Sequence, residues 1–241
     1  KYKVIAIGQT LYSYLDGQLV GLYDATTPLA GLTPSLFKDL YVTPGLGNYC
    51  SDVNISDWLG RMVVGLGDSI TVIESNRQAW LKALPADSLF LQRGVSGNTV
   101  AMVRDRIAAD LAVSLPTGNT CYVVLWCGTN SLANNVAPAT ALAELQTAIN
   151  NVLAINANTK IILPTTFRLR TGGLTGITAG QFATNADTYN AGLPSLTGAY
   201  KVVEMNDANS TVAGFFLADG IHPKGENYSA IVQKIAPWVL L

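Results

Sequence analysis

The sequence predicts an α/β fold, in which a doubly wound, five-stranded parallel sheet lies between two layers of helices, with a small β-rich N-terminal extension. The main observation is an alternation that begins near residue 59. Short apolar runs, typical of strands buried on both faces, alternate there with longer segments whose apolar residues recur at helical spacing. In addition, 49% of the residues are hydrophobic and only 13% are charged, so most of the chain is expected to be folded and buried.

The N-terminal region has a different pattern. Apolar and aromatic runs at residues 2–7, 11–15 and 19–23 are separated by turn residues. Asp16-Gly17, between the second and third runs, is a strong hairpin signal. A region of this size has little core of its own. We therefore divide the chain into a β-rich region over residues 1–58 and an α/β domain over residues 59–241.

The α/β domain contains five expected strands and five expected helices. The strands cover residues 62–66, 88–92, 121–127, 160–163 and 201–205. The helices cover residues 76–84, 99–113, 139–155, 179–193 and 224–238. The helix at 139–155 is the clearest, because its leucine, isoleucine and valine residues fall on one face.

Composition disfavours several classes of function. The net charge is −1 and no run of Lys or Arg occurs, so nucleic-acid binding is not expected. No apolar stretch approaches the ~20 residues that span a bilayer, so no membrane span is expected. The start at Lys1, without Met or a signal-peptide apolar segment, indicates a processed form or an excised piece.

Metal binding and disulfide bonds are not expected either. One histidine and three cysteines without a CxxC motif cannot form a Cys/His zinc site, so the sequence predicts no metal. Cys121 and Cys127 flank one expected strand and would lie roughly 20 Å apart, too far for a disulfide. A bridge from either of them to Cys50 remains open.

Polar residues follow the expected strands at the sheet edge where function gathers in open α/β folds. Gly67-Asp68-Ser69 follows the first strand, and Gly97 lies in a Val-Ser-Gly-Asn-Thr segment after the second. Asn130 follows the third strand, and Asp219-Gly-Ile-His222 follows the fifth. A serine, a glycine, an asparagine and the only histidine should therefore meet at one edge.

These residue types suit nucleophilic catalysis on an ester. Ser69 needs an adjacent base to attack at neutral pH, and His222 can take and return its proton. Asp219 can orient the imidazole and stabilise its charged form. The amides of Ser69 and Gly97 and the side-chain amide of Asn130 are candidate donors to the oxyanion.

The four segments together resemble the SGNH (GDSL) hydrolase and esterase family over roughly residues 60–241. Each segment alone is weak, but their order and their positions after strands make the combination specific. The resemblance implies the flavodoxin-like, three-layer α/β/α fold of SGNH hydrolases, a serine esterase mechanism and no cofactor. One departure is Ser131, where the family commonly has Asp after the asparagine. We expect little effect, because this position is outside the proposed catalytic set.

Residues 1–58 are not part of that family's core. Their Tyr-Leu-Asp-Gly-Gln-Leu-Val-Gly segment loosely resembles the end of a concanavalin-like or laminin-G-like β-sandwich. This implies the catalytic end of a longer protein that carries a sugar-binding domain. A secreted, extracellular or virion-associated location is then favoured.

The favoured function is a serine esterase that hydrolyses small acyl esters, with acetyl groups on carbohydrate as the expected substrate class. The partner is then a small-molecule or polysaccharide ester. Two alternatives remain open. One is a lysophospholipase or thioesterase of the same fold, and the other is a non-catalytic carbohydrate-binding or surface module.

Each candidate residue also has a structural interpretation. Ser69 could cap its helix, His222 could be a loop histidine before a proline, and Asn130 could be a left-handed turn residue. Arg168 and Arg170, in the loop after the fourth strand, could shape the substrate cleft or lie in a solvated loop.

Two further residues are assigned structural roles. Asp68, beside Ser69, is expected to bond nearby backbone rather than act as a second acid. Trp126 lies inside an apolar strand and is expected in the core rather than in a substrate platform.

Overall fold

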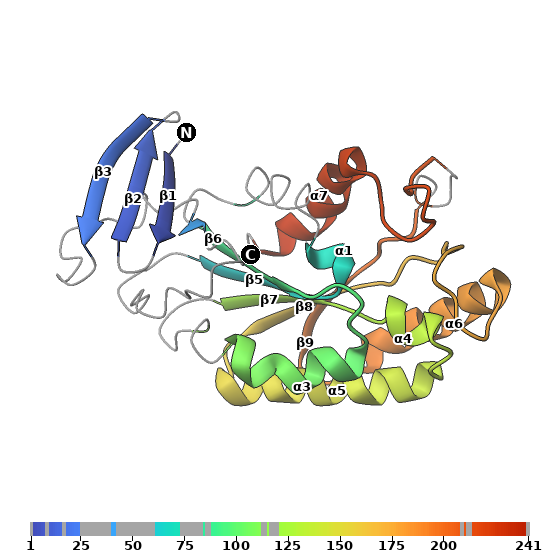
Figure 1. Cartoon of the computed structure of the whole chain (residues 1–241). Coiled ribbons are helices and arrows are strands. Elements are labelled where there is room, and N and C mark those ends of the chain that lie inside the picture. The colour runs from blue at the N-terminus through green and yellow to red at the C-terminus, as the bar shows by residue number, and fades with distance from the viewer. Residues whose placement is uncertain are drawn as a thin grey trace.

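The structure is a computed structural model of the whole chain, shown in Figure 1. It describes residues 2–7, 10–15, 18–24, 40–41, 61–72, 84, 88–111, 115, 121–207, 210 and 214–239. The helix expected at residues 76–84 and the cysteine at position 50 lie outside the described residues, apart from position 84 itself.

A five-stranded, fully parallel sheet forms the centre of the α/β domain, as predicted. Its strand order is β6-β5-β7-β8-β9, so the chain starts inside the sheet and winds outward in both directions. This is the flavodoxin-like order. The strands are β5 (Arg61–Gly67), β6 (Ser88–Gly94), β7 (Cys121–Trp126), β8 (Lys160–Pro164) and β9 (Ala199–Val203). The last strand begins and ends two residues earlier than predicted.

Helices cover both faces of this sheet (Figure 1). The described helices are α1 (Ser69–Val72), α3 (Val100–Leu111), α4 (Thr129–Ala133), α5 (Pro138–Ile155), α6 (Ala179–Gly192) and α7 (Tyr228–Val239), with 3-10 turns η3 (Leu193–Ser195) and η4 (Gly225–Asn227). The helix predicted at residues 224–238 starts later, because its first residues form η4. The five-residue α4 was not predicted, since it is too short to show helical periodicity.

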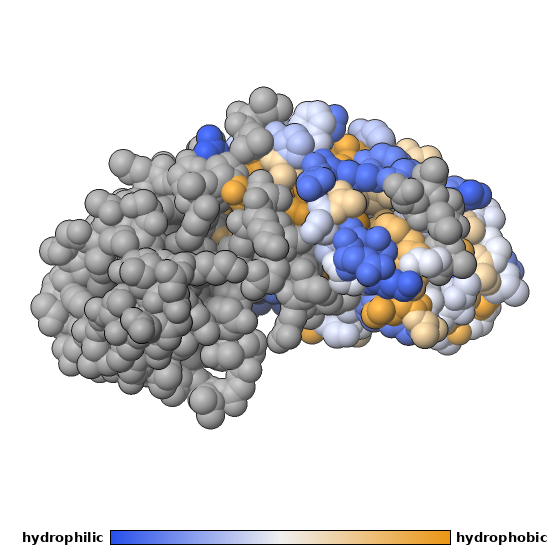
Figure 2. Space-filling model, turned by 90° about the horizontal axis from the view of Figure 1, so that it is seen from above, coloured by the Kyte–Doolittle hydropathy of each residue, from blue (hydrophilic) through white to orange (hydrophobic). Residues whose placement is uncertain are grey.

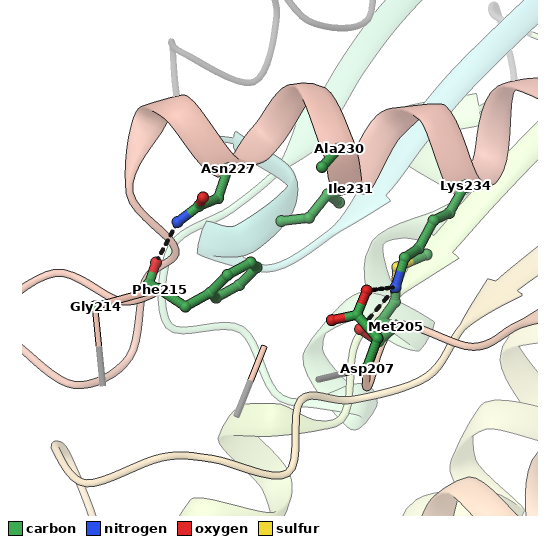
Figure 3. A pocket seen from close by; sticks show the side chains of 8 residues that line it. All are labelled: Met205, Asp207, Gly214, Phe215, Asn227, Ala230, Ile231 and Lys234. Carbon is green, nitrogen blue, oxygen red and sulfur yellow. Dashed lines mark hydrogen bonds and ion pairs between the residues drawn. The ribbon is translucent and has the colours of Figure 1, made fainter. Parts of the chain in front are cut away.

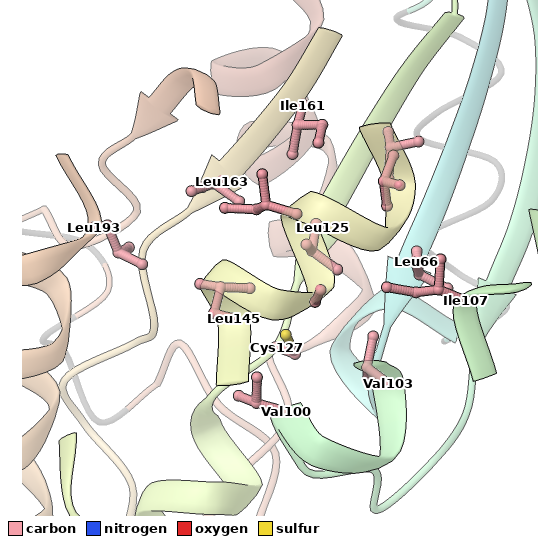
Figure 4. Packing of buried hydrophobic residues seen from close by; sticks show 14 of the residues in the cluster. Leu66, Val100, Val103, Ile107, Leu125, Cys127, Leu145, Ile161, Leu163 and Leu193 are labelled. Atoms are coloured by element: carbon pink, nitrogen blue, oxygen red, sulfur yellow. The ribbon is translucent and has the colours of Figure 1, made fainter. Parts of the chain in front are cut away.

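Two apolar clusters hold the three layers together. Residues alternate along β7: Cys121, Val123 and Leu125 face α3 and α5, whereas Tyr122, Val124 and Trp126 face the other way. Figure 4 shows part of the first cluster, to which α3 contributes Val100, Val103 and Ile107 and the strands contribute leucines such as Leu66 and Leu125. The second cluster packs the other face of the sheet against α1, α7 and the rings of Phe167, Phe215 and Phe216. Trp126 is only 3% exposed, so it lies in the core as predicted.

The N-terminal region contains a separate four-stranded sheet of order β3-β2-β1-β4. Its strands are β1 (Tyr2–Ile7), β2 (Thr10–Leu15), β3 (Gln18–Asp24) and β4 (Leu40–Tyr41). The antiparallel pairing of β2 with β3 ends with Leu15 opposite Gln18, which confirms the predicted hairpin. The resemblance to a β-sandwich and the division at residue 58 stay predictions.

Two further expectations concern cysteines and membranes. Cys121 and Cys127 are both buried, and no disulfide joins them to each other. Within the described residues, no helix is both long and apolar enough to cross a bilayer.

Candidate active site

A chain of hydrogen bonds joins Ser69, His222 and Asp219 at the carboxyl edge of the sheet. His222 Nε2 lies 2.7 Å from Ser69 Oγ, and His222 Nδ1 lies 2.7 Å from Asp219 Oδ2. Ser69 is the first residue of α1, directly after β5, whereas the other two lie in the loop between β9 and α7. Residues 153 positions apart in the sequence thus meet, because strands β5 and β9 end at the same edge.

The turn that carries the acid and the histidine is closed by its own backbone. Asp219 Oδ1 accepts the amides of Ile221 at 2.9 Å and His222 at 3.1 Å, so one carboxylate oxygen holds the turn and the other faces the imidazole. Gly220 has a φ of 65°, and a Cβ there would lie 2.0 Å from Thr171 Oγ1. Only glycine therefore fits this position without strain.

Ser69 is not the cap of its helix. Asp68 takes that role, because its Oδ1 accepts the Ile70 amide at 2.9 Å. The serine hydroxyl is thereby left to bond with the histidine. Asp68 behaves as predicted, as a partner of nearby backbone.

The carboxyl groups at this edge differ in their environments. Burial raises the pKa of Asp68 to about 7, although the Ile70 amide and the charges of Arg170 and His222 oppose the rise. Desolvation also raises the pKa of Asp219, but the hydrogen bonds from His222 and from the amides of the turn outweigh it and leave that pKa below its ordinary value. Asp219 is thus the carboxylate that stays ionised next to the imidazole.

Within the described part of the chain, the amides of Ser69 and Gly97 donate to no other protein group and so have no competing acceptor. Gly97 has a φ of 79° in the loop after β6, a conformation that favours glycine. That loop is held to the serine segment because Val95 donates its amide to the Gly67 carbonyl at 3.0 Å.

Asn130 lies on α4 and is not a left-handed turn residue. The positive φ, 130°, belongs to Gly128, where a Cβ would meet the Tyr189 ring at 2.8 Å. Asn130 donates from Nδ2 to the Asn98 carbonyl at 3.0 Å. One Nδ2 hydrogen therefore holds the Gly97 loop, and the second is left for another acceptor.

Two side chains to which the sequence analysis gave no role support this edge. Ser131 Oγ accepts the Val100 amide at 2.9 Å and so caps α3 from another helix. Arg106, on α3, donates to the Gly67 and Arg93 carbonyls and to Asn98 Oδ1. Most of these partners are backbone atoms, which leave no signal in the sequence.

The two arginines of the loop after β8 have different environments. Arg168 is exposed and pairs with Asp187 at 2.7 Å. Arg170 is only 6% exposed and donates to Asn130 Oδ1 at 3.2 Å. The solvated-loop interpretation therefore fits Arg168, and Arg170 belongs to the structure of the site.

A pocket elsewhere on this side of the molecule is formed by α7 and the segments at residues 205–207 and 214–215 (Figure 3). Its polar groups bond to one another or to backbone. Lys234 pairs with Asp207 at 2.7 Å, and Asn227 donates to the Phe215 carbonyl. No residue of the Ser69–His222–Asp219 chain lines this pocket.

In the view from above, hydrophilic and hydrophobic residues are interspersed over the coloured part of the surface (Figure 2). Among the described residues, no group of three His, Cys, Asp or Glu side chains is arranged to hold a metal ion.

Comparison with known protein families identifies the family of this chain. A model of the GDSL-like lipase/acylhydrolase family matches residues 66–230, which include all four segments singled out above. The chain belongs to this family. It is therefore an ester hydrolase of the SGNH type, as the sequence motifs indicated. No curated protein matches the chain.

Solved structures with the same fold include a carbohydrate acetylesterase from Sinorhizobium meliloti (17% identity, TM-score 0.61, 75% of this chain and 98% of that one). An acetyl-xylooligosaccharide esterase from Geobacillus stearmophilus, in a mutant form, is also 17% identical, with a TM-score of 0.60 over 77% and 97% of the two chains. A lipase/acylhydrolase from Enterococcus faecalis is 18% identical, with a TM-score of 0.57 over 74% and 95%. At these identities the likeness shows the fold.

Proposed function

We propose that this family member is a serine esterase in which Ser69 is the nucleophile, His222 the general base and acid, and Asp219 the residue that orients the imidazole. The observation that carries the proposal is the unbroken hydrogen-bond chain, with 2.7 Å at each of its two links. This is the geometry that a serine and a base need for proton transfer. The chain has no other histidine, so any imidazole mechanism must use His222.

The proposed reaction has two halves. Ser69 Oγ attacks the ester carbonyl while its proton passes to His222 Nε2, and the tetrahedral intermediate collapses as the imidazolium protonates the leaving alcohol. Water then attacks the acyl-serine, and His222 accepts its proton and returns it to Ser69. Asp219 stabilises the imidazolium in both halves and stays ionised, in keeping with its lowered pKa.

The oxyanion of both intermediates is assigned to three donors: the amides of Ser69 and Gly97 and the second Nδ2 hydrogen of Asn130. The two amides are free of protein acceptors within the described part of the chain. Asn130 is already oriented by its bond to Asn98. Donors fixed before the charge develops stabilise it most effectively, because they need no reorganisation.

The proposed substrates are small acyl esters, with acetyl groups on carbohydrate as the favoured class. Two of the structures with the same fold are described as a carbohydrate acetylesterase and an acetyl-xylooligosaccharide esterase, which supports this choice by analogy. The resemblance of residues 1–58 to a sugar-binding sandwich agrees with it.

The catalytic assignment is tested with Ser69→Ala and His222→Ala in hydrolysis of p-nitrophenyl acetate. Each substitution should lower kcat by about 10⁴-fold or more. Ser195→Ala is the matched control, because Ser195 is exposed and its hydroxyl only bonds the Gly192 carbonyl. A fluorophosphonate probe should label the wild type and the control but not Ser69→Ala. Near-wild-type turnover by Ser69→Ala or His222→Ala would overturn the mechanism.

The substrate class is tested with a panel of acetylated xylan, p-nitrophenyl esters of increasing chain length, an acyl thioester and a lysophospholipid. Acetyl esters should give the highest kcat/KM. A preference for long acyl chains or thioesters would instead favour the lysophospholipase or thioesterase alternative and leave the roles of Ser69 and His222 unchanged.

A further inference from the structure

We propose that Arg170 is a positioning residue that fixes the orientation of the Asn130 side-chain amide and links it to the turn of Asp219 and His222. This inference rests on the proposed function, because it assigns Arg170 a task in forming the oxyanion site. Nothing in the sequence motifs includes this residue, which lies in the loop between β8 and α6.

The hydrogen bonds of Arg170 are directed inward. The side chain donates from Nε to the Gly172 carbonyl at 2.9 Å and from Nη2 to the Gly173 carbonyl at 3.2 Å. From Nη1 it donates to Thr129 Oγ1 at 3.0 Å and to Asn130 Oδ1 at 3.2 Å. A guanidinium has five N–H donors, so four are used within the protein. With 6% exposure, the group is placed to organise neighbouring residues rather than to bind an anionic substrate.

These bonds select one of the two orientations of the Asn130 amide. An arginine only donates, so the atom that faces Arg170 must be the oxygen. A carbonyl only accepts, so the atom that faces Asn98 must be the nitrogen, and the Nδ2 bond of 3.0 Å agrees. A flipped amide would place oxygen against oxygen on one side and N–H against N–H on the other. Arg170 and Asn98 thus keep Nδ2, the proposed oxyanion donor, on the side of the Gly97 loop.

Arg170 also belongs to the segment that supports the acid and histidine. The next residue, Thr171, donates its amide to the Gly220 carbonyl at 3.0 Å. The loop after β8 packs closely against the turn of Asp219, because a Cβ on Gly172 would lie 1.9 Å from the Asp219 carbonyl oxygen. The bonds from Arg170 to the carbonyls of Gly172 and Gly173 close this segment around the guanidinium. One side chain therefore contacts the proposed oxyanion donor and holds the loop against the turn of Asp219.

The test compares Arg170→Met with Arg168→Met. Both changes remove a guanidinium from the same loop, but Arg168 is exposed and paired with Asp187. Arg170→Met should lower kcat for p-nitrophenyl acetate by about 10²-fold, the cost of one misplaced oxyanion donor, and change KM by less than about threefold. Arg168→Met should keep both constants near wild type, and Arg170→Lys should recover part of kcat because one or two of the donated bonds can re-form.

A double-mutant cycle with Asn130→Ala separates this role from a merely structural one. If Arg170 acts through Asn130, adding Arg170→Met to Asn130→Ala lowers kcat little further. If Arg170→Met does not fold, the same cycle is run with Arg170→Lys. Multiplicative losses in the cycle, or an Arg170→Met enzyme as active as Arg168→Met, would overturn the inference. Either result would leave the proposed function intact, provided that Ser69→Ala and His222→Ala are inactive.

Discussion

Replacing Asp68 with Asn is expected to remove most of the pH dependence of stability between pH 5 and pH 8. Asp68 is 1% exposed, and burial raises its pKa from an ordinary 3.8 to about 7. Asparagine keeps an oxygen that can accept the Ile70 amide but carries no charge to bury. The two side chains thus differ in whether they can ionise, not in whether they can accept the Ile70 amide.

The sign and size follow from proton linkage. A carboxyl whose pKa is higher in the folded state stabilises that state most when it is protonated, below about pH 4. This contribution is lost as pH rises through about 7, because the buried form must then ionise. With pKa values of 3.8 and about 7 in the unfolded and folded states, the free energy of unfolding falls by about 2–3 kcal/mol between pH 5 and pH 8.

Urea unfolding at several pH values from 5 to 8 measures this loss. The wild type should lose about 2–3 kcal/mol more than Asp68→Asn over that range, with similar m-values. Asp105→Asn is the control, since Asp105 is exposed and bonds only its neighbour Arg104. Parallel pH profiles for the wild type and Asp68→Asn would refute the reasoning, because Asp68 would then titrate alike in both states.

Two other substitutions test the supports of the site. Ser131→Ala should lower the free energy of unfolding by about 1 kcal/mol, because the Val100 amide loses its cap. Thermal or urea unfolding measures this loss, and the control Ser195→Ala should leave the free energy of unfolding unchanged. Equal stability of the two variants would contradict the capping role of Ser131. Gly220→Ala should lower kcat by about 10²-fold, because its Cβ would collide with Thr171 Oγ1 and displace the turn of His222. Gly176→Ala is its control, since Gly176 also has a positive φ, 72°, but open space around it. Equal kcat values for these two variants would show that the collision is relieved without moving the histidine.

Much of the fold could be predicted because its signals are local. Strands β5, β7 and β8 are buried on both faces and appear as apolar runs, and α5 and α6 show helical spacing along their length. The elements that were not predicted, or were predicted with other bounds, also have local causes. The short α4 lacks the length for periodicity, and the first turn of the last predicted helix became η4. The boundary of β9 shifted because this strand lies at the edge of the sheet and is only partly buried, so its apolar residues mark its ends weakly.

The candidate site divides in the same way. Ser69, Gly97, Asn130, Asp219 and His222 could be proposed from the sequence because each lies shortly after a strand or in a short motif. Only the tertiary structure decided that Asp68 caps the helix and that the Ser69 hydroxyl bonds His222, since both Asp68 and Ser69 can cap a helix. The tertiary structure also decided that Arg170 is buried, because Arg168 two residues away has the same type of side chain and a solvated environment.

By itself, the sequence determined the α/β class, the order of its strands and helices along the chain, and the residue types available for ester chemistry. These follow from periodicity, composition and motifs, which act over a few residues at a time. The tertiary structure alone decided the strand order β6-β5-β7-β8-β9 and the meeting of Ser69 with His222. It also decided that Arg170 lies against Asn130. Such contacts join segments far apart in the chain, and they depend on how strand edges and buried hydrogen bonds pair in space.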